Sequence, residues 1–213
     1  MTSSIERGLW VPDAGQRSNV ATFVERARRL DEAAVIRLSQ RSGEMVVGWA
    51  ATGFDVLTSR VFAGAVRPAD ISAGADELLR GLAAAGPSGY VDPGFPMDSA
   101  WRGALPPDDG YVHIDDVPAD VVTDLAQRGA EVSKEQGAQG PPVSLLDQDV
   151  IHASAGDVTV GVPMRCVFAL TAMGFVDSAA ADDVVRVRTM GAWVRVDARY
   201  GSVYYRRDVL RLV

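Results

Sequence analysis

Lysine and cysteine are almost absent from this chain of 213 residues. Lys134 is the single lysine among twenty-one basic residues, so positive charge is carried by arginine. A composition bias alone can produce that preference, and we do not take it as evidence of phosphate recognition. Cys166 is the single cysteine, which excludes an internal disulfide and fits a reducing cytoplasm.

Long hydrophobic runs are missing as well. The longest apolar stretch, Val158–Val176, is interrupted by Pro163 and Arg165 and is too short to span a bilayer. We therefore expect a cytoplasmic protein that makes no membrane contact.

The sequence also lacks the short motifs that assemble many catalytic and cofactor sites. It contains no G-x-G-x-x-G, P-loop, H-E-x-x-H, C-x-x-C or G-x-S-x-G pattern. Cys166 lies in an apolar run, and neither His113 nor His152 can be placed beside it as a base, so we interpret it as a small buried hydrophobe. These absences predict no cofactor, no metal and no catalytic residues, and they favour a protein that is not an enzyme.

The charge that is present is unevenly distributed. The chain carries a net charge of −7, which argues against nucleic-acid binding over its whole surface. Its last thirty residues, Val184–Val213, hold seven arginines against two aspartates, a net charge of +5, which leaves −12 for the remainder. The basic residues in this segment alternate with apolar ones, and a period of two is typical of a β-strand.

This alternation predicts an antiparallel ribbon with an arginine-rich face. Arg186 and Arg188 share one side of their strand, and Arg195 and Arg199 share one side of the next, with Asp197 between them. Like charges on facing strands are destabilising, so the face needs counter-charges from the protein's own acids or from an external anion. The candidate ligand-binding residues are Arg186, Arg188, Arg195, Arg199, Trp193 and Tyr200.

The rest of the chain predicts an α+β fold, with antiparallel sheets, helices packed on them and the basic ribbon at the end. In residues 1–86 we expect a helix over 16–30, three strands near 36–39, 45–50 and 56–62, and a second helix over 71–85. Short turns between the strands favour an antiparallel α-β-β-β-α unit.

Residues 87–111 form a loop rich in proline and glycine, which also carries aromatic side chains. The aromatic residues of the segment are Tyr90, Phe95, Trp101 and Tyr111. A flexible linker would be polar, so we expect these rings to pack on the protein or on a partner.

Residues 112–213 are predicted to form a helical unit that ends in the ribbon. We expect helices over 116–135, 144–153 and 163–175. A short helix, the turn 155–157, a second helix and a basic hairpin follow the order of a winged helix, which leaves nucleic-acid binding open. The second helix is apolar nearly all round, however, and such helices are usually buried.

A weak acid–base pair lies just after the loop. His113 and Asp115 alternate, so a strand would direct both side chains to one side, as a catalytic site could use. Asp115 and Asp116 could equally serve to cap a helix. An enzyme with a pocket under loop 86–111 is the third hypothesis.

Three stretches, Trp49–Leu57, Val162–Leu170 and Asp197–Tyr204, resemble uncharacterised proteins of high-GC Gram-positive bacteria. The resemblance covers about a third of the chain and implies an actinobacterial source and a cytoplasmic location. It implies no activity, and it assigns no residue a role.

The leading hypothesis is a non-catalytic interaction or regulatory protein. We expect it to form homo-oligomers or to bind an acidic protein or another anionic ligand, because an acidic body and a basic ribbon are complementary. A nucleic acid bound at the arginine ribbon is the alternative.

Overall fold

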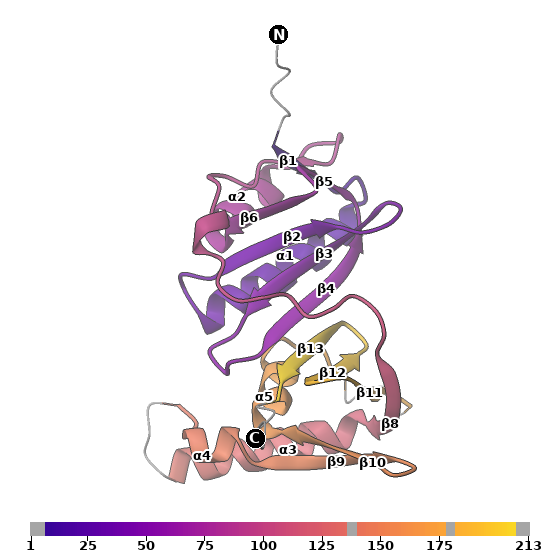
Figure 1. Ribbon diagram of the computed structural model, residues 1–213. Helices are drawn as coiled ribbons and strands as arrows, with labels where there is room; N and C mark the ends of the chain where they lie inside the picture. The colour runs from indigo at the N-terminus through magenta and orange to yellow at the C-terminus, as the bar shows by residue number, and fades with distance from the viewer. Residues whose placement is uncertain (1–6, 136–139, 178–181, 208–213) are drawn as a thin grey trace. The chain divides into compact units, whose positions relative to one another are not determined.

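The computed structural model describes residues 7–135, 140–177 and 182–207, and the chain divides into two compact units. Unit 1 comprises residues 1–53 and 59–104, and unit 2 comprises residues 54–58 and 105–213. The fold is α+β with antiparallel sheets and helices packed on them, as the sequence predicts (Figure 1). Within the described ranges, no helix is long and apolar enough to cross a membrane.

Ten elements belong to the first part of the chain, and the first two residues of β4 fall in unit 2. They are β1 (Gly8–Trp10), α1 (Ala14–Leu30), β2 (Val35–Gln40), β3 (Met45–Ala51), β4 (Leu57–Ala63), β5 (Ala65–Arg67), β6 (Asp70–Gly74), α2 (Ala75–Ala84), β7 (Tyr90–Val91) and the 3-10 helix η1 (Asp98–Ala100). The remaining elements are β8 (Val112–Pro118), α3 (Ala119–Glu135), α4 (Val143–Leu146), β9 (Asp149–Ala155), β10 (Val158–Pro163), α5 (Met164–Ala172), β11 (Val184–Met190), β12 (Trp193–Ala198) and β13 (Gly201–Arg206).

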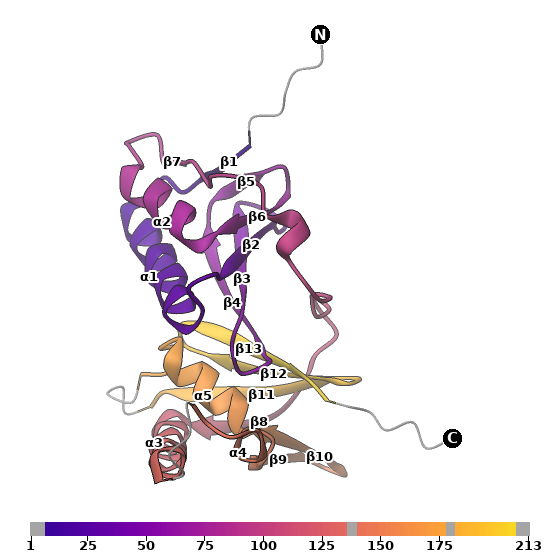
Figure 2. The ribbon, with the colours of Figure 1, turned by 90° about the vertical axis from the view of Figure 1, so that its left-hand side faces the viewer.

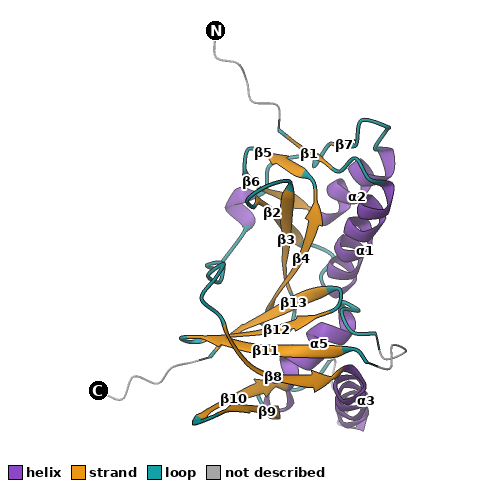
Figure 3. Ribbon diagram, turned by 90° about the vertical axis from the view of Figure 1, so that its right-hand side faces the viewer, coloured by secondary structure: helices purple, strands orange, loops and turns teal. Residues whose placement is uncertain are grey.

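Unit 1 is built on strands in the order β6-β2-β3-β4, with α1 and α2 on one face (Figures 2 and 3). Helix α1 is capped by Asp13, whose carboxylate accepts a hydrogen bond from Gln16 N at 2.7 Å. Its apolar stripe, which includes Val20 and Phe23, is buried together with Ile36 of β2. A smaller sheet pairs β5, β1 and β7.

Unit 2 contains four antiparallel strands in the order β8-β11-β12-β13, which lie next to one another in Figure 3. Helix α5 packs on β13, and α3 packs against α5 and β8. A separate hairpin joins β9 and β10. The apolar alternation of the basic segment is buried, and these side chains are Val185, Val187, Val194, Val196 and Val203.

The two units share one plan. In each, three consecutive strands form a meander, β2-β3-β4 or β11-β12-β13, and a fourth strand pairs with the first of them. That fourth strand, β6 or β8, continues directly into a helix, α2 or α3, without a connecting loop. Proline is tolerated at the end of β8 because this strand is the last in the sheet order.

The helices 16–30 and 163–175, the three N-terminal strands and the basic ribbon are confirmed within one to three residues. The helix expected over 71–85 begins only at Ala75, because Asp70–Gly74 pairs with β2 as strand β6. Alanine, serine and glycine have little intrinsic preference for a strand, but the backbone hydrogen bonds to β2 outweigh propensity here.

Two further helix predictions are wrong in part. The helix expected from 116 begins at Ala119, because Asp116 lies in β8 opposite Arg186 and Ala119 N donates to Asp183 O at 2.9 Å. The helix expected over 144–153 ends at Leu146, and β9 follows. The turn 155–157 therefore joins two strands, and the winged-helix order is not present.

Candidate functional site

The sheet of unit 2 carries three of the predicted arginines on one face. Arg188 lies directly opposite Arg195, and Arg186 lies directly opposite Asp197. These four residues and Tyr204, which pairs with Arg195, define what we call the arginine face. The face lies on the side opposite the buried valines, because successive side chains alternate across a strand.

Asp197 neutralises the centre of the arginine face. Its Oδ1 accepts from Arg195 Nε at 2.6 Å and from the Ser202 hydroxyl at 2.6 Å. Its Oδ2 lies 2.9 Å from Arg188 Nε, in an orientation that does not form a hydrogen bond. One carboxylate, with a side chain only 16% exposed, therefore serves two guanidinium groups and leaves one positive charge in excess.

Arg186 has a weaker partner at the edge of the face. Its Nε lies 3.7 Å from Asp116 Oδ1, and the same oxygen lies 2.9 Å from His113 Nε2. The Arg186 side chain is 52% exposed and that of Asp116 44%, so water screens the pair. This guanidinium stays accessible to an external anion.

Two tyrosines close over Arg195. Its guanidinium lies 5.4 Å from the ring centre of Tyr111 and 5.6 Å from that of Tyr204, and the two rings meet edge to face at 6.2 Å. Burial, reinforced by Tyr204, raises the pKa of Tyr111 to about 12. Burial lowers the pKa of Arg195, but Tyr204 and Asp197 outweigh it and the net change is upward.

The other candidates divide between two places. Trp193 begins β12 opposite Arg206, whose guanidinium lies 6.0 Å from the Trp193 ring centre. Arg199 and Tyr200 lie in the turn between β12 and β13, outside the arginine face, with the guanidinium 5.9 Å from the tyrosine ring. The sequence predicted Arg199 on the same strand face as Arg195. This prediction is wrong, because β12 ends at Ala198 and Arg199 lies in the turn that follows.

His113 and Asp115 are not brought together as an acid–base pair. The register of β8 against β11 shifts between Val187 and Arg188, so that His113 contacts the carboxylate of Asp116. The Asp115 carboxylate instead accepts from the backbone N of Asp116 at 2.9 Å. Within residues 7–135, 140–177 and 182–207, no three His, Cys, Asp or Glu residues gather as metal ligands would.

Helix α5, which a winged helix would present to DNA, is buried from Met164 to Leu170. Burial also raises the pKa of the Cys166 thiol, which holds it in the neutral form. Sequence reasoning did not identify the structural role of Arg165, although a lone arginine in an apolar helix is a signal for it. Its guanidinium donates to Phe54 O at 2.9 Å and to the Asp147 carboxylate, and it lies 5.7 Å from the Tyr205 ring centre.

Two family models match the chain, one for each half. Residues 4–103 match the family described as Domain of unknown function (DUF8010), and residues 106–210 match Domain of unknown function (DUF8185). No curated protein matches the sequence.

Solved bacterial structures share the fold. The DNA polymerase sliding clamp from Caulobacter crescentus has a TM-score of 0.59 at 13% identity, over 94% of this chain and 65% of that one. The DNA polymerase III subunit beta from Pseudomonas aeruginosa has a TM-score of 0.57 at 10% identity, over 92% and 64%. The DNA polymerase III beta chain from Streptococcus pneumoniae has a TM-score of 0.58 at 9% identity, over 98% and 68%.

This chain thus spans about two thirds of the length of the sliding clamps that it matches. At identities of 9–13% the similarity establishes the fold alone. Over most of its length, the chain has a fold similar to that of bacterial sliding clamps, and its two halves match two domains of unknown function.

Proposed function

We propose that this chain is a non-catalytic interaction protein that self-associates, with the arginine face of one copy contacting an acidic surface of another. One observation carries the proposal: Asp197 is shared by Arg188 and Arg195, so the face keeps an excess positive charge. Arg186, with a weak and screened partner, adds an accessible guanidinium at the edge.

The same chain contains the acidic residues that a complementary surface requires. Unit 2 contains 10 arginine and lysine residues against 17 aspartate and glutamate residues, a net charge of −7, although it carries the arginine face. Opposite charges on two patches of one chain favour association between copies and orient the encounter. A different protein with an acidic surface would bind at the same arginine face.

The structural neighbours support an interaction role. They are sliding clamps and beta subunits of DNA polymerase III, and a subunit works within an assembly. We extend only the interaction role to this chain. A buried thiol and a chain without a second cysteine support a reducing compartment such as the cytoplasm.

Light scattering tests the proposal at about 50 mM and about 500 mM NaCl, because added salt screens charges at the surface. We expect a mass above the 22.6 kDa monomer at low salt that falls at high salt. The double variant Arg186→Gln, Arg188→Gln should weaken association about tenfold, whereas Arg128→Gln, an exposed change on α3, should not.

A wild-type protein that stays monomeric at both salt concentrations would contradict the proposal. Nucleic acid is not the partner we propose, because unit 2 is acidic overall and α5 is buried. Binding of generic duplex DNA that weakens steeply with salt would favour that alternative instead.

A further inference from the structure

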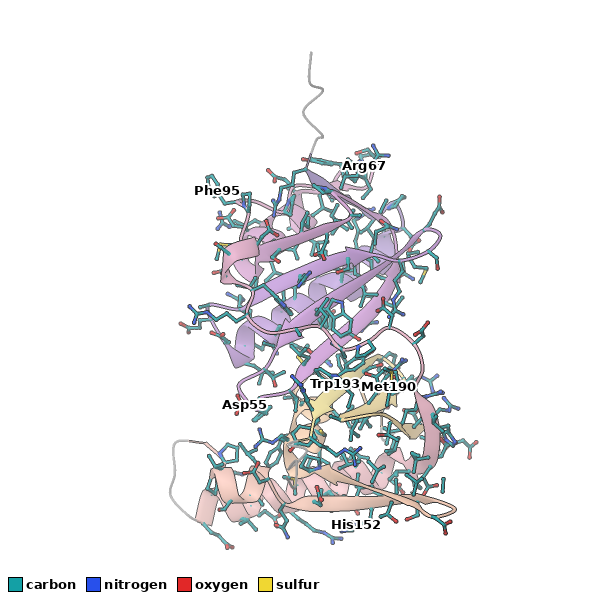
Figure 4. All side chains as sticks on the ribbon, in the orientation of Figure 1. Asp55, Arg67, Phe95, His152, Met190 and Trp193 are labelled. Atoms are coloured by element: carbon teal, nitrogen blue, oxygen red, sulfur yellow. The ribbon has the colours of Figure 1, made fainter. Side chains whose placement is uncertain are left out.

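Three of the four aromatic rings in residues 86–111 pack on the protein. Tyr90 lies 5.4 Å from Trp10, Trp101 lies under the Arg37 guanidinium at 5.9 Å, and Tyr111 meets Tyr204. Phe95 differs, because it is 81% exposed, the highest value among the exposed large hydrophobic side chains of the described residues. Figure 4 shows it projecting away from unit 1.

The backbone before Phe95 is held rigidly. Gly94 has a φ of +75°, and a Cβ there would lie 2.5 Å from Glu77 Cβ, so the loop packs tightly on α2. The Arg7 guanidinium donates to Gly94 O and, at 2.8 Å, to Ser72 O. The residues that lead into Phe95 are thereby tied to β6.

The backbone after Phe95 is held by the same strand. Met97 N donates to Ser72 O at 2.9 Å, and Ser72 N donates to the Asp98 carboxylate at 2.7 Å. Pro96 forms a β-bridge with Ala73. A rigid loop that presents one bare aromatic ring loses little entropy on binding, which is typical of an anchor residue in an interface.

Unit 2 offers a candidate receptor for such a ring. A cavity of about 260 Å³ is lined by Phe54, Ala130, Ser133, Lys134, Pro141 and Phe168. The rings of Phe54 and Phe168 lie 5.9 Å apart at 38°. An apolar cavity of about 150 Å³ admits benzene, so this one has room for a phenyl ring.

Charge favours the match between this ring and this cavity. Lys134 is the one charged residue in the cavity lining, whereas Asp92 and Asp98 flank Phe95 in the sequence. Asp55, next to Phe54, does not belong to the cavity lining, and its carboxylate lies 3.5 Å from Arg165 Nη1, although Arg165 is shared with Asp147.

A second apolar cavity, in unit 1, has acidic residues at its rim. In unit 1 a cavity of about 260 Å³ beside Trp10 and Ala63 is bordered by Asp13 and Glu44. Two carboxylates at that rim would repel Asp92 and Asp98, so the two cavities make opposite predictions.

We infer that Phe95 of one copy inserts into the Phe54–Phe168 cavity of a second copy. The inference rests on the proposed self-association and specifies an apolar contact for it. The ring lies on unit 1 and the cavity on unit 2, so each copy offers both a ring and a cavity, and the contact joins two different patches.

Sedimentation equilibrium from about 5 to about 500 µM, at about 0.5 M NaCl to screen the arginine face, measures this contact. Phe95→Ser should weaken association at least about 30-fold, the effect of losing a buried aromatic anchor. Ala130→Trp, which fills the cavity, should do the same. Gln127→Trp, on an exposed position of α3, and Ala63→Trp, at the unit 1 cavity, should leave association unchanged.

Mixing the two defective variants gives the sharpest result. Phe95→Ser keeps an intact cavity and Ala130→Trp keeps an intact ring, so an equimolar mixture should form a 1:1 dimer although each variant alone is monomeric. Association unchanged by Phe95→Ser, or a mixture that stays monomeric while the wild type associates, overturns this inference alone. A wild-type protein that is monomeric at every concentration and at both salt concentrations overturns the proposed function as well.

Discussion

Units 1 and 2 have a similar arrangement of side chains on the sheet face that lies opposite the buried strand residues. In unit 1, Arg37 donates to Asp70 at 2.7 and 2.8 Å and lies over Trp101. In unit 2, Arg195 donates to Asp197 and lies over Tyr111. Each face thus holds an arginine between a carboxylate and an aromatic ring from the proline-rich segment.

The units differ in how completely they balance charge. Unit 1 contains 11 arginines and 11 acids, whereas unit 2 contains 10 basic residues and 17 acids. Asp70 is paired with one arginine, but Asp197 is shared by two. The same plan therefore gives a unit with no net charge and an acidic unit with a locally basic face.

The largest expected effect concerns burial of charge. Arg165 is the one charged residue that is buried in the described part of the chain, and Arg165→Ala would remove the hydrogen bonds that its guanidinium donates to Phe54 O and to the Asp147 carboxylate. We expect a loss of about 3 kcal/mol in the free energy of unfolding. Arg80→Ala in unit 1, where the side chain is 70% exposed, should cost at most about 0.5 kcal/mol. Urea denaturation followed by circular dichroism measures the loss for both variants. Equal losses in the two variants would contradict this prediction.

The second largest effect is a difference in stability between variants of Asp197 and Asp70. Asp197→Asn leaves Arg188 and Arg195 opposite each other without a counter-charge, and we expect a loss of about 2 kcal/mol. Asp70→Asn removes a more exposed carboxylate that pairs with a single arginine, and should cost about 0.5 kcal/mol. The difference between these two losses should decrease as the salt concentration rises, because salt screens the repulsion between Arg188 and Arg195. A larger loss at Asp70 in the same urea titrations would reverse this ranking.

The smallest effect is a pH dependence confined to unit 2. The pKa of Tyr111 is about 12 in the folded protein against an ordinary 10.0, so folding favours the neutral phenol. That contribution is complete below pH 10 and is lost as pH rises from 10 through 12. Absorbance at 295 nm should show the late ionisation of Tyr111, and Tyr111→Phe should remove that component. An unchanged titration in the variant would place the late phenol elsewhere.

Patterns that depend on neighbouring residues were predictable. The alternation of valine and arginine after 184 indicated a ribbon with one buried side, and its register confirms the strands. The helical spacing in 16–30 was equally clear. The predictions failed at Asp70–Gly74, whose pairing partner β2 lies far away in the sequence, and at Asp149–Ala155, where a hairpin with the adjacent strand β10 replaces most of the expected helix.

The candidate site was likewise predictable only in part. Asp197 was among the acids expected to balance the arginines, since it lies two residues from Arg195. The contact of His113 with Asp116 in place of Asp115 could not be predicted, because a shift in the pairing of β8 with β11 causes it. Neither could the exposure of Phe95, which depends on the hydrogen bond that Arg7 donates to Gly94 O and on the one that Met97 N donates to Ser72 O.

The sequence by itself determined the period of each strand and helix, the charge of each segment and the identity of the arginine-bearing side, because these properties depend on residues a few positions apart. Only the tertiary structure decided which carboxylate each guanidinium meets, that two arginines share Asp197, and that one aromatic ring of four stays bare. Those outcomes depend on strand register and loop packing, which are set by contacts between residues distant in the chain.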